Sequence, residues 1–276
     1  MPRPRKRFAQ HWLRSDAALR AIINAAELTE SDRILEIGPG TGSLTQHLLP
    51  KAAAVVGVEI DEGLCRQLPK RFPVDNLFVI EGDILQLDLA AQLAEQPHFQ
   101  APNKVVANIP YNITGPLLEY LLGRISQPVT PPYDVIVLLV QKEIADRVSA
   151  SPGSKAFGVL SVRVQYLADA EIICAVPRTA FKPAPKVESA VIRLRPRPPI
   201  QPARDPKHLE ILIKQAFSSK RKMLRNNIKG LIEPEQLLPV LTQLGINPEA
   251  RPEALSVAQW VALSDALGDR PLDSHS

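Results

Sequence analysis

Four consecutive residues, Asn108-Ile109-Pro110-Tyr111, bring together the groups needed to grip a flat base by its exocyclic amine. The amine lone pair of adenine or cytosine is conjugated into the ring, so the amine is a poor nucleophile. Acceptors for its hydrogens, here the Asn108 side-chain oxygen and a backbone carbonyl near Ile109, favour the pyramidal form in which the lone pair is free. The Tyr111 ring can stack on the base and fix its angle of attack.

The same four residues have a purely structural interpretation. Asn108 would cap a turn, Pro110 would begin the next helix and Tyr111 would belong to the core, because Asn and Pro are ordinary turn residues. The tetrapeptide alone leaves both interpretations open, so its context has to decide.

The elements around this tetrapeptide alternate between short apolar strands and amphipathic helices. Strands are predicted at residues 33–38, 54–60, 77–82, 104–107 and 133–140, and helices at 44–49, 62–72 and 117–123. This alternation predicts an α/β fold with a parallel sheet and helices on both faces. Ligands of such sheets bind at the carboxyl ends of the strands, where the tetrapeptide lies.

A glycine-rich turn, EIGPGTG at residues 36–42, follows the first predicted strand. Such a turn lets a ligand approach the backbone, and Glu59 at the end of the next strand has the spacing of an acid that holds ribose hydroxyls. Dinucleotide folds usually carry Gly-x-Gly-x-x-Gly, whereas the order here is Gly-x-Gly-x-Gly. It resembles the S-adenosylmethionine loop of Rossmann-like methyltransferases. Asp83, after the third strand, either accepts a bond from the cofactor adenine or caps a turn.

The second half of the chain is predicted to change character. A helix at residues 143–148 and β-like runs at 158–167, 171–176 and 187–194 precede a proline-rich linker, and the last two runs form a hairpin at the sheet edge. Helices are predicted at 208–228, 235–244 and 257–267, with Ser256 as an N-cap and Gly245 and Gly268 as stops. We therefore predict a Rossmann-like domain over residues 1–198 and a small C-terminal helical domain over 199–276.

Composition limits the classes of protein that fit. A chain of 276 residues with 45% apolar content can bury a large core. No apolar run approaches the roughly 20 residues of a membrane span, and the N-terminal charges precede no apolar segment, so we expect a cytoplasmic protein without a membrane partner. Cys65, Cys174 and the five scattered histidines predict neither a disulfide nor a metal site.

The net charge of +4 is unevenly distributed. One basic cluster comprises Arg3, Arg5, Lys6, Arg7 and Arg14, and another comprises Lys220, Arg221, Lys222, Arg225 and Lys229. Either cluster alone could be a solvated surface. Both together, in a chain with a base-gripping tetrapeptide, favour a nucleic-acid partner.

Eight segments of the sequence together match one known family. The chain resembles the ribosomal RNA adenine dimethyltransferases over nearly its full length, and within them the small-subunit (16S) branch, the kasugamycin-resistance methyltransferases. The matching segments are RKRFAQHWL (5–13), EIGPGTGSLT (36–45), VEID (58–61), GDIL (82–85), NIPYNIT (108–114), LLVQKEIADR (138–147), FKPAPKVESAV (181–191) and QAFSSKRKMLRNNI (215–228).

The resemblance implies a role for each matching residue. The cofactor S-adenosyl-L-methionine is expected to be bound by His11, Leu13, Gly38, Glu59, Asp83 and Asn108. The catalytic group is expected to comprise Asn108, Pro110, Tyr111 and Phe181, with the two aromatic rings stacking on a flipped adenine. Ribosomal RNA is expected to be bound by Lys220, Arg221, Lys222 and Arg225 of the helical domain. The family usually has Asn at the position of His11 and often Phe at the position of Trp12, so the contact at His11 is expected to differ in detail.

The reaction implied is dimethylation of two adjacent adenosines in the 3′-terminal hairpin loop of 16S rRNA by a monomer acting on the assembling 30S subunit. A target in a loop can be splayed from its stack. One alternative is methylation of large-subunit RNA, as in the macrolide-resistance enzymes, against which the segment at 181–191 and the basic C-terminal helix count. The other is an assembly factor without catalysis, against which the intact Glu59, Asp83, Asn108 and Tyr111 count.

Overall fold

The computed structural model describes residues 11–219 and 221–268 of the chain. It divides into two compact units. The first, here called the sheet unit, contains the described part of Met1–Leu121 together with Pro131–Ala145 and Ala170–Pro196. The second, the helical unit, contains Leu122–Thr130, Asp146–Asp169 and the described part of Arg197–Ser276. The helical unit therefore includes two segments that precede the proline-rich linker. The assignment of cofactor binding to residues 1–198 and of RNA recognition to residues 199–276 stays a prediction.

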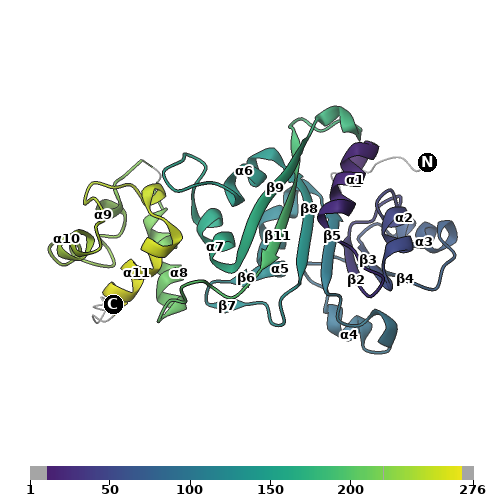
Figure 1. The fold of residues 1–276 in the computed structure, drawn as a ribbon, viewed down its shortest axis with the longest axis horizontal. Helices are drawn as coiled ribbons and strands as arrows, with labels where there is room; N and C mark the ends of the chain where they lie inside the picture. The colour runs from purple at the N-terminus through teal and green to yellow at the C-terminus, as the bar shows by residue number, and fades with distance from the viewer. Residues whose placement is uncertain (1–10, 220, 269–276) are drawn as a thin grey trace. The chain divides into compact units, whose positions relative to one another are not determined.

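The centre of the sheet unit is a seven-stranded sheet with the order β4-β3-β2-β5-β8-β11-β9 (Figure 1). Its strands are β2 (Arg33–Ile37), β3 (Ala54–Glu59), β4 (Leu77–Glu81), β5 (Lys104–Asn108), β8 (Val135–Gln141), β9 (Ala168–Val176) and β11 (Ser189–Pro196). The strands from β4 to β8 pair in parallel, and β11 is antiparallel to β8. The α/β fold and the five predicted parallel strands are confirmed, and β9 and β11 are neighbours at the sheet edge as expected.

The parallel strands alternate with helices and short 3-10 turns. The helices of this part are α1 (Asp16–Ala25), α2 (Thr45–Leu48), α3 (Glu62–Arg71), α4 (Leu89–Leu93) and α5 (Thr114–Leu122). The turns are η2 (Leu49–Lys51), η3 (Pro97–Phe99), η4 (Tyr111–Ile113) and η5 (Arg178–Ala180).

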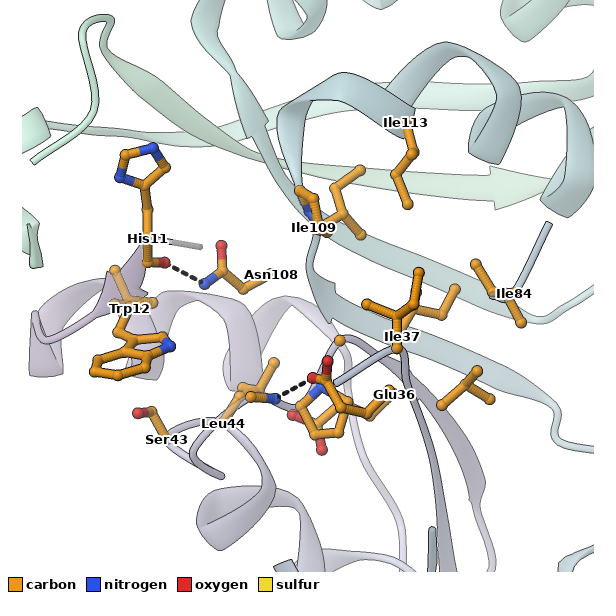
Figure 2. A pocket seen from close by; sticks show the side chains of 18 of the residues that line it. His11, Trp12, Glu36, Ile37, Ser43, Leu44, Ile84, Asn108, Ile109 and Ile113 are labelled. Carbon is orange, nitrogen blue, oxygen red and sulfur yellow. Dashed lines mark hydrogen bonds between the residues drawn. The ribbon is translucent and has the colours of Figure 1, made fainter. Parts of the chain in front are cut away.

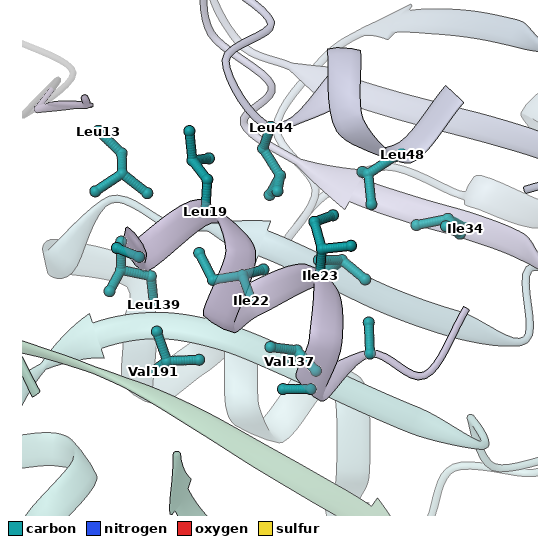
Figure 3. Close-up of a cluster of buried hydrophobic side chains, with 14 of the residues drawn as sticks. Leu13, Leu19, Ile22, Ile23, Ile34, Leu44, Leu48, Val137, Leu139 and Val191 are labelled. Carbon is teal, nitrogen blue, oxygen red and sulfur yellow. The ribbon is translucent and has the colours of Figure 1, made fainter. Parts of the chain in front are cut away.

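Helix α1 shows why these segments fold as they do. It begins at Ser15, whose hydroxyl accepts a hydrogen bond from the Ala18 amide at 3.3 Å, a normal N-cap. Its apolar side, including Leu19 and Ile22, lies in one cluster with side chains of β8 and β11 (Figure 3). Burial of this side against the sheet holds α1 in place, because most of a helix's stability in a protein comes from such packing.

A two-stranded pairing in the sheet unit was not predicted. Strand β1 (Trp12–Leu13) pairs antiparallel with β10 (Phe181–Lys182), with Leu13 opposite Phe181. The pairing continues to Arg14, whose amide donates to the Ala180 carbonyl at 2.8 Å. Strands of two residues carry no periodic pattern, so only the tertiary structure reveals that the N-terminal segment lies beside the segment around Phe181.

The structure of the helical unit differs from two predictions. Residues 158–167 are not a strand but helix α7 (Val159–Leu167), which begins where the Gly158 amide donates to the Ser161 hydroxyl at 3.0 Å. The β-branched composition of this segment favours a strand, but burial on several sides of the helix outweighs that weak propensity.

The predicted helix at 208–228 is interrupted. It consists of α8 (Pro206–Ala216) and the short α9 (Leu224–Asn227). The buried Asn227 side chain donates to the carbonyls of Ala216 and Ser219, at 2.5 and 2.9 Å, and so satisfies carbonyl groups that a continuous helix would have paired itself.

Three remaining helices agree with the predictions: α6 (Lys142–Val148), α10 (Pro234–Gln243) and α11 (Val257–Gly268). The turn η6 (Pro252–Ala254) and the hairpin of β6 (Gly123–Arg124) with β7 (Gln127–Pro128) were not predicted. Ser256 caps α11, since its hydroxyl accepts from the Gln259 amide at 3.2 Å. Gly245 follows α10 with a left-handed φ of 65°, as a helix stop requires. No helix within 11–219 and 221–268 is long and apolar enough to cross a membrane.

Candidate active site

A pocket of about 320 Å³ opens at the carboxyl ends of β2, β3, β4 and β5, within the sheet unit (Figure 2). This is the edge at which open α/β sheets hold ligands, and the volume suits a nucleoside-sized molecule. The pocket is lined by all six residues expected to bind the cofactor, and also by Pro110 and Tyr111. Eight of the nine predicted cofactor-binding and catalytic residues are thus brought together in one place, and Phe181 is the exception.

The glycine loop and Glu59 form one side of this pocket. The three loop glycines have left-handed φ values of 69°, 59° and 81°, which glycine adopts without strain. The Gly40 amide donates to Glu59 Oε2 at 2.9 Å, and the Asp61 amide donates to Oε1 at 2.9 Å. Each carboxylate oxygen thus keeps a further lone pair for a ligand hydroxyl. Burial raises the pKa of the Glu59 carboxyl, while the bonds from the Asp61 and Gly40 amides lower it.

Glu36 is a pocket residue that the choice of site residues missed, although it precedes the loop glycines by two positions. Its side chain is buried and accepts a hydrogen bond from the Thr45 hydroxyl at 2.7 Å. Burial, and secondarily the charge of Glu59, raises the pKa of Glu36 to about 8. An acid in a glycine-rich turn that is followed by an apolar helix is the signal that could have identified it.

This raised pKa predicts a pH dependence of stability. Between the ordinary carboxyl pKa and about 8, Glu36 keeps its proton in the folded protein and loses it in the unfolded chain, so its contribution to stability falls as pH rises through that range. We expect Glu36→Gln to increase the free energy of unfolding by about 4 kcal/mol at pH 8 and far less at pH 4.5. Urea unfolding at both pH values checks this, and an equal change at both would refute the assignment.

The third strand end carries Asp83 and an apolar neighbour. Asp83 Oδ1 accepts from the Leu85 amide at 3.0 Å, so the turn-capping interpretation holds, and Oδ2 accepts from Gln86 Nε2 at 3.2 Å. The carboxylate nevertheless lines the pocket. Ile60 and Ile84, each directly after a strand-end acid, line it too, and Ile60 is 45% exposed. Such side chains suit the faces of a purine ring, and sequence reasoning did not single them out.

The tetrapeptide at the end of β5 forms another side of the pocket. Ile109 is buried and anchors the segment, while Asn108 and Tyr111 are only partly buried. Asn108 Nδ2 lies 3.4 Å from the His11 carbonyl oxygen, to which it donates, and no described residue donates to Asn108 Oδ1. The Tyr111 hydroxyl lies 2.6 Å from the Ser189 hydroxyl. Burial raises the pKa of Tyr111, so the phenol stays protonated at neutral pH. Because no described residue donates to it, Asn108 Oδ1 is available as an acceptor for a ligand.

The N-terminal segment closes the pocket from the side of β1. His11 and Trp12 line it (Figure 2), and so does Leu13, which is buried at 3% exposure. Trp12 lies over the glycine loop, because a side chain at Gly40 would meet its indole at 3.8 Å. The indole Nε1 is buried and has no acceptor among the described residues.

Phe181 is placed differently from the other predicted residues. Its side chain is 5% exposed and belongs to the hydrophobic cluster with Leu13, and it is not among the residues that line the pocket. Its stacking on a target base stays a prediction, and in this structure its ring serves the core.

The predicted RNA-binding residues lie in the helical unit. Arg221 and Lys222 are exposed, Arg225 is partly buried, and Lys220 lies outside the described residues. In the N-terminal cluster, Arg14 is exposed, and the other four basic residues lie in the undescribed segment at 1–10. Within the described ranges, no group of three or more His, Cys, Asp and Glu side chains is arranged to hold a metal ion.

Comparison with known proteins agrees with this geometry. A family model described as ribosomal RNA adenine dimethylase matches residues 1–269. The chain belongs to this family. Ribosomal RNA small subunit methyltransferase A of Nostoc sp. is 58% identical over 269 residues, 97% of this chain and 99% of that protein. The protein of the same name from Acaryochloris marina is 59% identical over 268 residues, 97% of this chain and 98% of its own.

Two solved structures share the fold over both units. A dimethyladenosine transferase from Plasmodium falciparum has a TM-score of 0.76 at 29% identity and covers 92% of this chain and 96% of its own. The 23S rRNA methyltransferase ErmE has a TM-score of 0.72 at 25% identity, with 93% and 99% covered. The chain is thus a Rossmann-like S-adenosylmethionine-dependent methyltransferase that acts on ribosomal RNA.

The pocket residues fit that cofactor. Glu59 keeps acceptor capacity for two vicinal hydroxyls, Ile60 and Ile84 offer apolar contact for a purine, and the buried Trp12 Nε1 lacks an acceptor. Gly38 and Gly40 present backbone to the pocket, since neither carries a side chain there.

Proposed function

We propose that the protein methylates the exocyclic amines of two adjacent adenosines in the 3′-terminal hairpin loop of 16S rRNA to dimethyladenosine. The proposal includes the assembling 30S subunit as substrate, a monomeric enzyme and a cytoplasmic location. The observation that carries it is Asn108, whose carboxamide oxygen is free at the rim of a nucleoside-sized pocket between the cofactor residues and Tyr111.

Sequence identity, more than the fold, supports the small-subunit substrate. The 23S rRNA methyltransferase ErmE has a TM-score of 0.72 against this chain, so the fold alone does not exclude a large-subunit substrate. The small subunit methyltransferases are 58–59% identical over almost the whole chain, whereas the 23S enzyme is 25% identical.

The protein's contribution to the reaction is positioning and lone-pair exposure. Bound S-adenosylmethionine supplies an electrophilic methyl group on its sulfonium. Asn108 Oδ1 and the Ile109 carbonyl accept from the target amine and hold it in the pyramidal form, in which its lone pair is free. The Tyr111 ring holds the plane of the base, and its bond to Ser189 fixes the ring. Orientation of this kind can contribute about 7 kcal/mol or more.

Loss of the Tyr111 ring should slow the reaction. We expect Tyr111→Ala to lower kcat/KM for the RNA about tenfold or more, because stacking of a base on an aromatic ring is worth about 1–3 kcal/mol. Tyr111→Phe keeps the ring and should retain most activity. Phe181→Ala is a poorer test because it also removes core packing. Steady-state methylation of unmodified small subunits measures these effects, and an Ala variant as fast as the Phe variant would remove the stacking role.

The substrate assignment is tested by offering the enzyme both ribosomal subunits. Unmodified small and large subunits are incubated separately with the protein and S-adenosylmethionine, and the RNA is cut into fragments for mass spectrometry. We expect dimethyladenosine at two adjacent positions of the 3′-terminal loop of 16S rRNA. Modification of 23S rRNA alone would establish the large-subunit reaction instead, and modification of neither would favour an assembly role.

A further inference from the structure

His11 lines the pocket and also contacts Asn108 and Tyr111, the two residues proposed to hold the target base. Its ring Nδ1 lies 2.8 Å from the Pro183 carbonyl oxygen, and because a carbonyl can only accept, Nδ1 carries the proton. The ring is nearly parallel to that of Tyr111, with centroids 5.8 Å apart and planes inclined by 20°. This is the range of an offset-stacked aromatic pair. The main-chain carbonyl of His11 is also the acceptor 3.4 Å from Asn108 Nδ2.

These contacts connect three segments far apart in the sequence. The β1–β10 pairing places His11 beside Pro183. In this position His11 contacts both Asn108 and Tyr111. The bond from Asn108 Nδ2 to the His11 carbonyl determines which end of the carboxamide faces the pocket, leaving Oδ1 toward the target amine. The His11 ring restrains one side of Tyr111, whose hydroxyl is fixed by Ser189.

We propose that His11 is a positioning residue for the acceptor base, acting through Asn108 and Tyr111. Its hydrogen bond to the Pro183 carbonyl holds the N-terminal segment in register, and that register sets the carbonyl that orients the Asn108 amide. This inference rests on the proposed function and names a duty for His11 beyond the cofactor contact that the family resemblance implies.

An asparagine, which the family resemblance leads us to expect at residue 11, could make the same hydrogen bond. The Nδ2 atom of Asn and the Nδ1 atom of His are both two bonds beyond Cβ, so an Asn at residue 11 can donate to the same carbonyl. A phenylalanine keeps the ring beside Tyr111 but cannot donate. The two substitutions therefore separate the hydrogen bond from the stacking contact.

The test compares His11→Asn, His11→Phe and His11→Ala. For each, kcat on unmodified small subunits is measured at saturating S-adenosylmethionine, and the Kd of S-adenosylhomocysteine is measured by calorimetry. A lost neutral hydrogen bond corresponds to about a fivefold change. We expect kcat to fall about fivefold in His11→Phe, which loses the hydrogen bond, about tenfold in His11→Ala, which loses the stacking contact as well, and only about twofold in His11→Asn, which keeps the bond. The Kd also reports any cofactor contact of His11, and we expect it to change by a smaller factor than kcat in His11→Phe and His11→Ala.

His98 provides a matched control. Its ring Nε2 also lies near a backbone carbonyl, that of Ala53 at 3.0 Å, and its ring also contacts an aromatic side chain, Phe99, but it does not line the pocket. His98→Phe should leave kcat unchanged.

Each other outcome counts against the proposal. Wild-type kcat in His11→Phe, or an equal loss in the Asn and Phe variants, would overturn the role of the Pro183 bond. A loss that follows the Kd of S-adenosylhomocysteine would make His11 a cofactor contact only. If the wild-type protein itself does not methylate the small subunit, the proposed function fails first, and that result is separate from any difference among the variants.

Discussion

Replacing Asn108 by alanine should lower kcat for methyl transfer by about a thousandfold. Asn108 is a partly buried residue that lines the pocket, and its Oδ1 has no donor among the described residues, so we expect its contribution to appear only when the target amine arrives. Removing one preorganised hydrogen-bonding group of this kind from an active site typically costs about 10²–10³ in rate. Single-turnover methylation with saturating enzyme and S-adenosylmethionine measures the step directly.

Cofactor binding is the control for this variant. Asn108 lies at the pocket edge but the cofactor end is formed by the glycine loop and Glu59, so the Kd of S-adenosylhomocysteine should change by less than about fivefold. Transfer at the wild-type rate would remove Asn108 from the mechanism. A loss of rate that is matched by an equal loss of cofactor affinity would assign it to the cofactor instead.

Replacing Glu59 by alanine should weaken cofactor binding about a hundredfold. The carboxylate has acceptor capacity left for two hydroxyls, and hydrogen bonds to a charged group are worth about 1.5–3 kcal/mol each. The change also releases the Gly40 amide, which Glu59 Oε2 accepts at 2.9 Å, so the loop loses a restraint at the same time. Calorimetry with S-adenosylhomocysteine measures the effect.

The neighbouring strand offers a matched control for Glu59. Glu81 ends β4 directly opposite Glu59 in the parallel register, but it is exposed and does not line the pocket. Glu81→Ala should leave the affinity unchanged. An equal loss in the two variants would mean that general negative charge at this sheet edge, and not the hydroxyl contacts of Glu59, sets cofactor affinity.

Local patterns predicted those parts of the structure that depend on neighbouring residues. The parallel strands, the glycine loop and the strand-end residues Glu59, Asp83 and Asn108 follow from periodicity, turn chemistry and the rule that strand ends meet at one edge. Their side chains therefore meet in the pocket as expected.

Features that depend on long-range contacts were not predictable in the same way. Residues 159–167 have strand-like composition but fold as α7 because of their surroundings, and the break between α8 and α9 depends on the Asn227 side chain. The β1–β10 pairing joins Trp12 and Leu13 to Lys182 and Phe181, which are far away in the sequence. This pairing also brings His11 close to Tyr111. The burial of Phe181 likewise depends on packing with Leu13. Such contacts leave no periodic signal in the sequence.

The most direct test of the central claim is nucleoside mass spectrometry of unmodified small subunits incubated with S-adenosylmethionine and either the wild-type protein or Asn108→Ala. Dimethyladenosine formed by the wild type and absent with the variant, while both bind S-adenosylhomocysteine alike, is the predicted result. Equal dimethyladenosine from both proteins would contradict the assigned role of Asn108, and none from either would contradict the proposed reaction on this substrate.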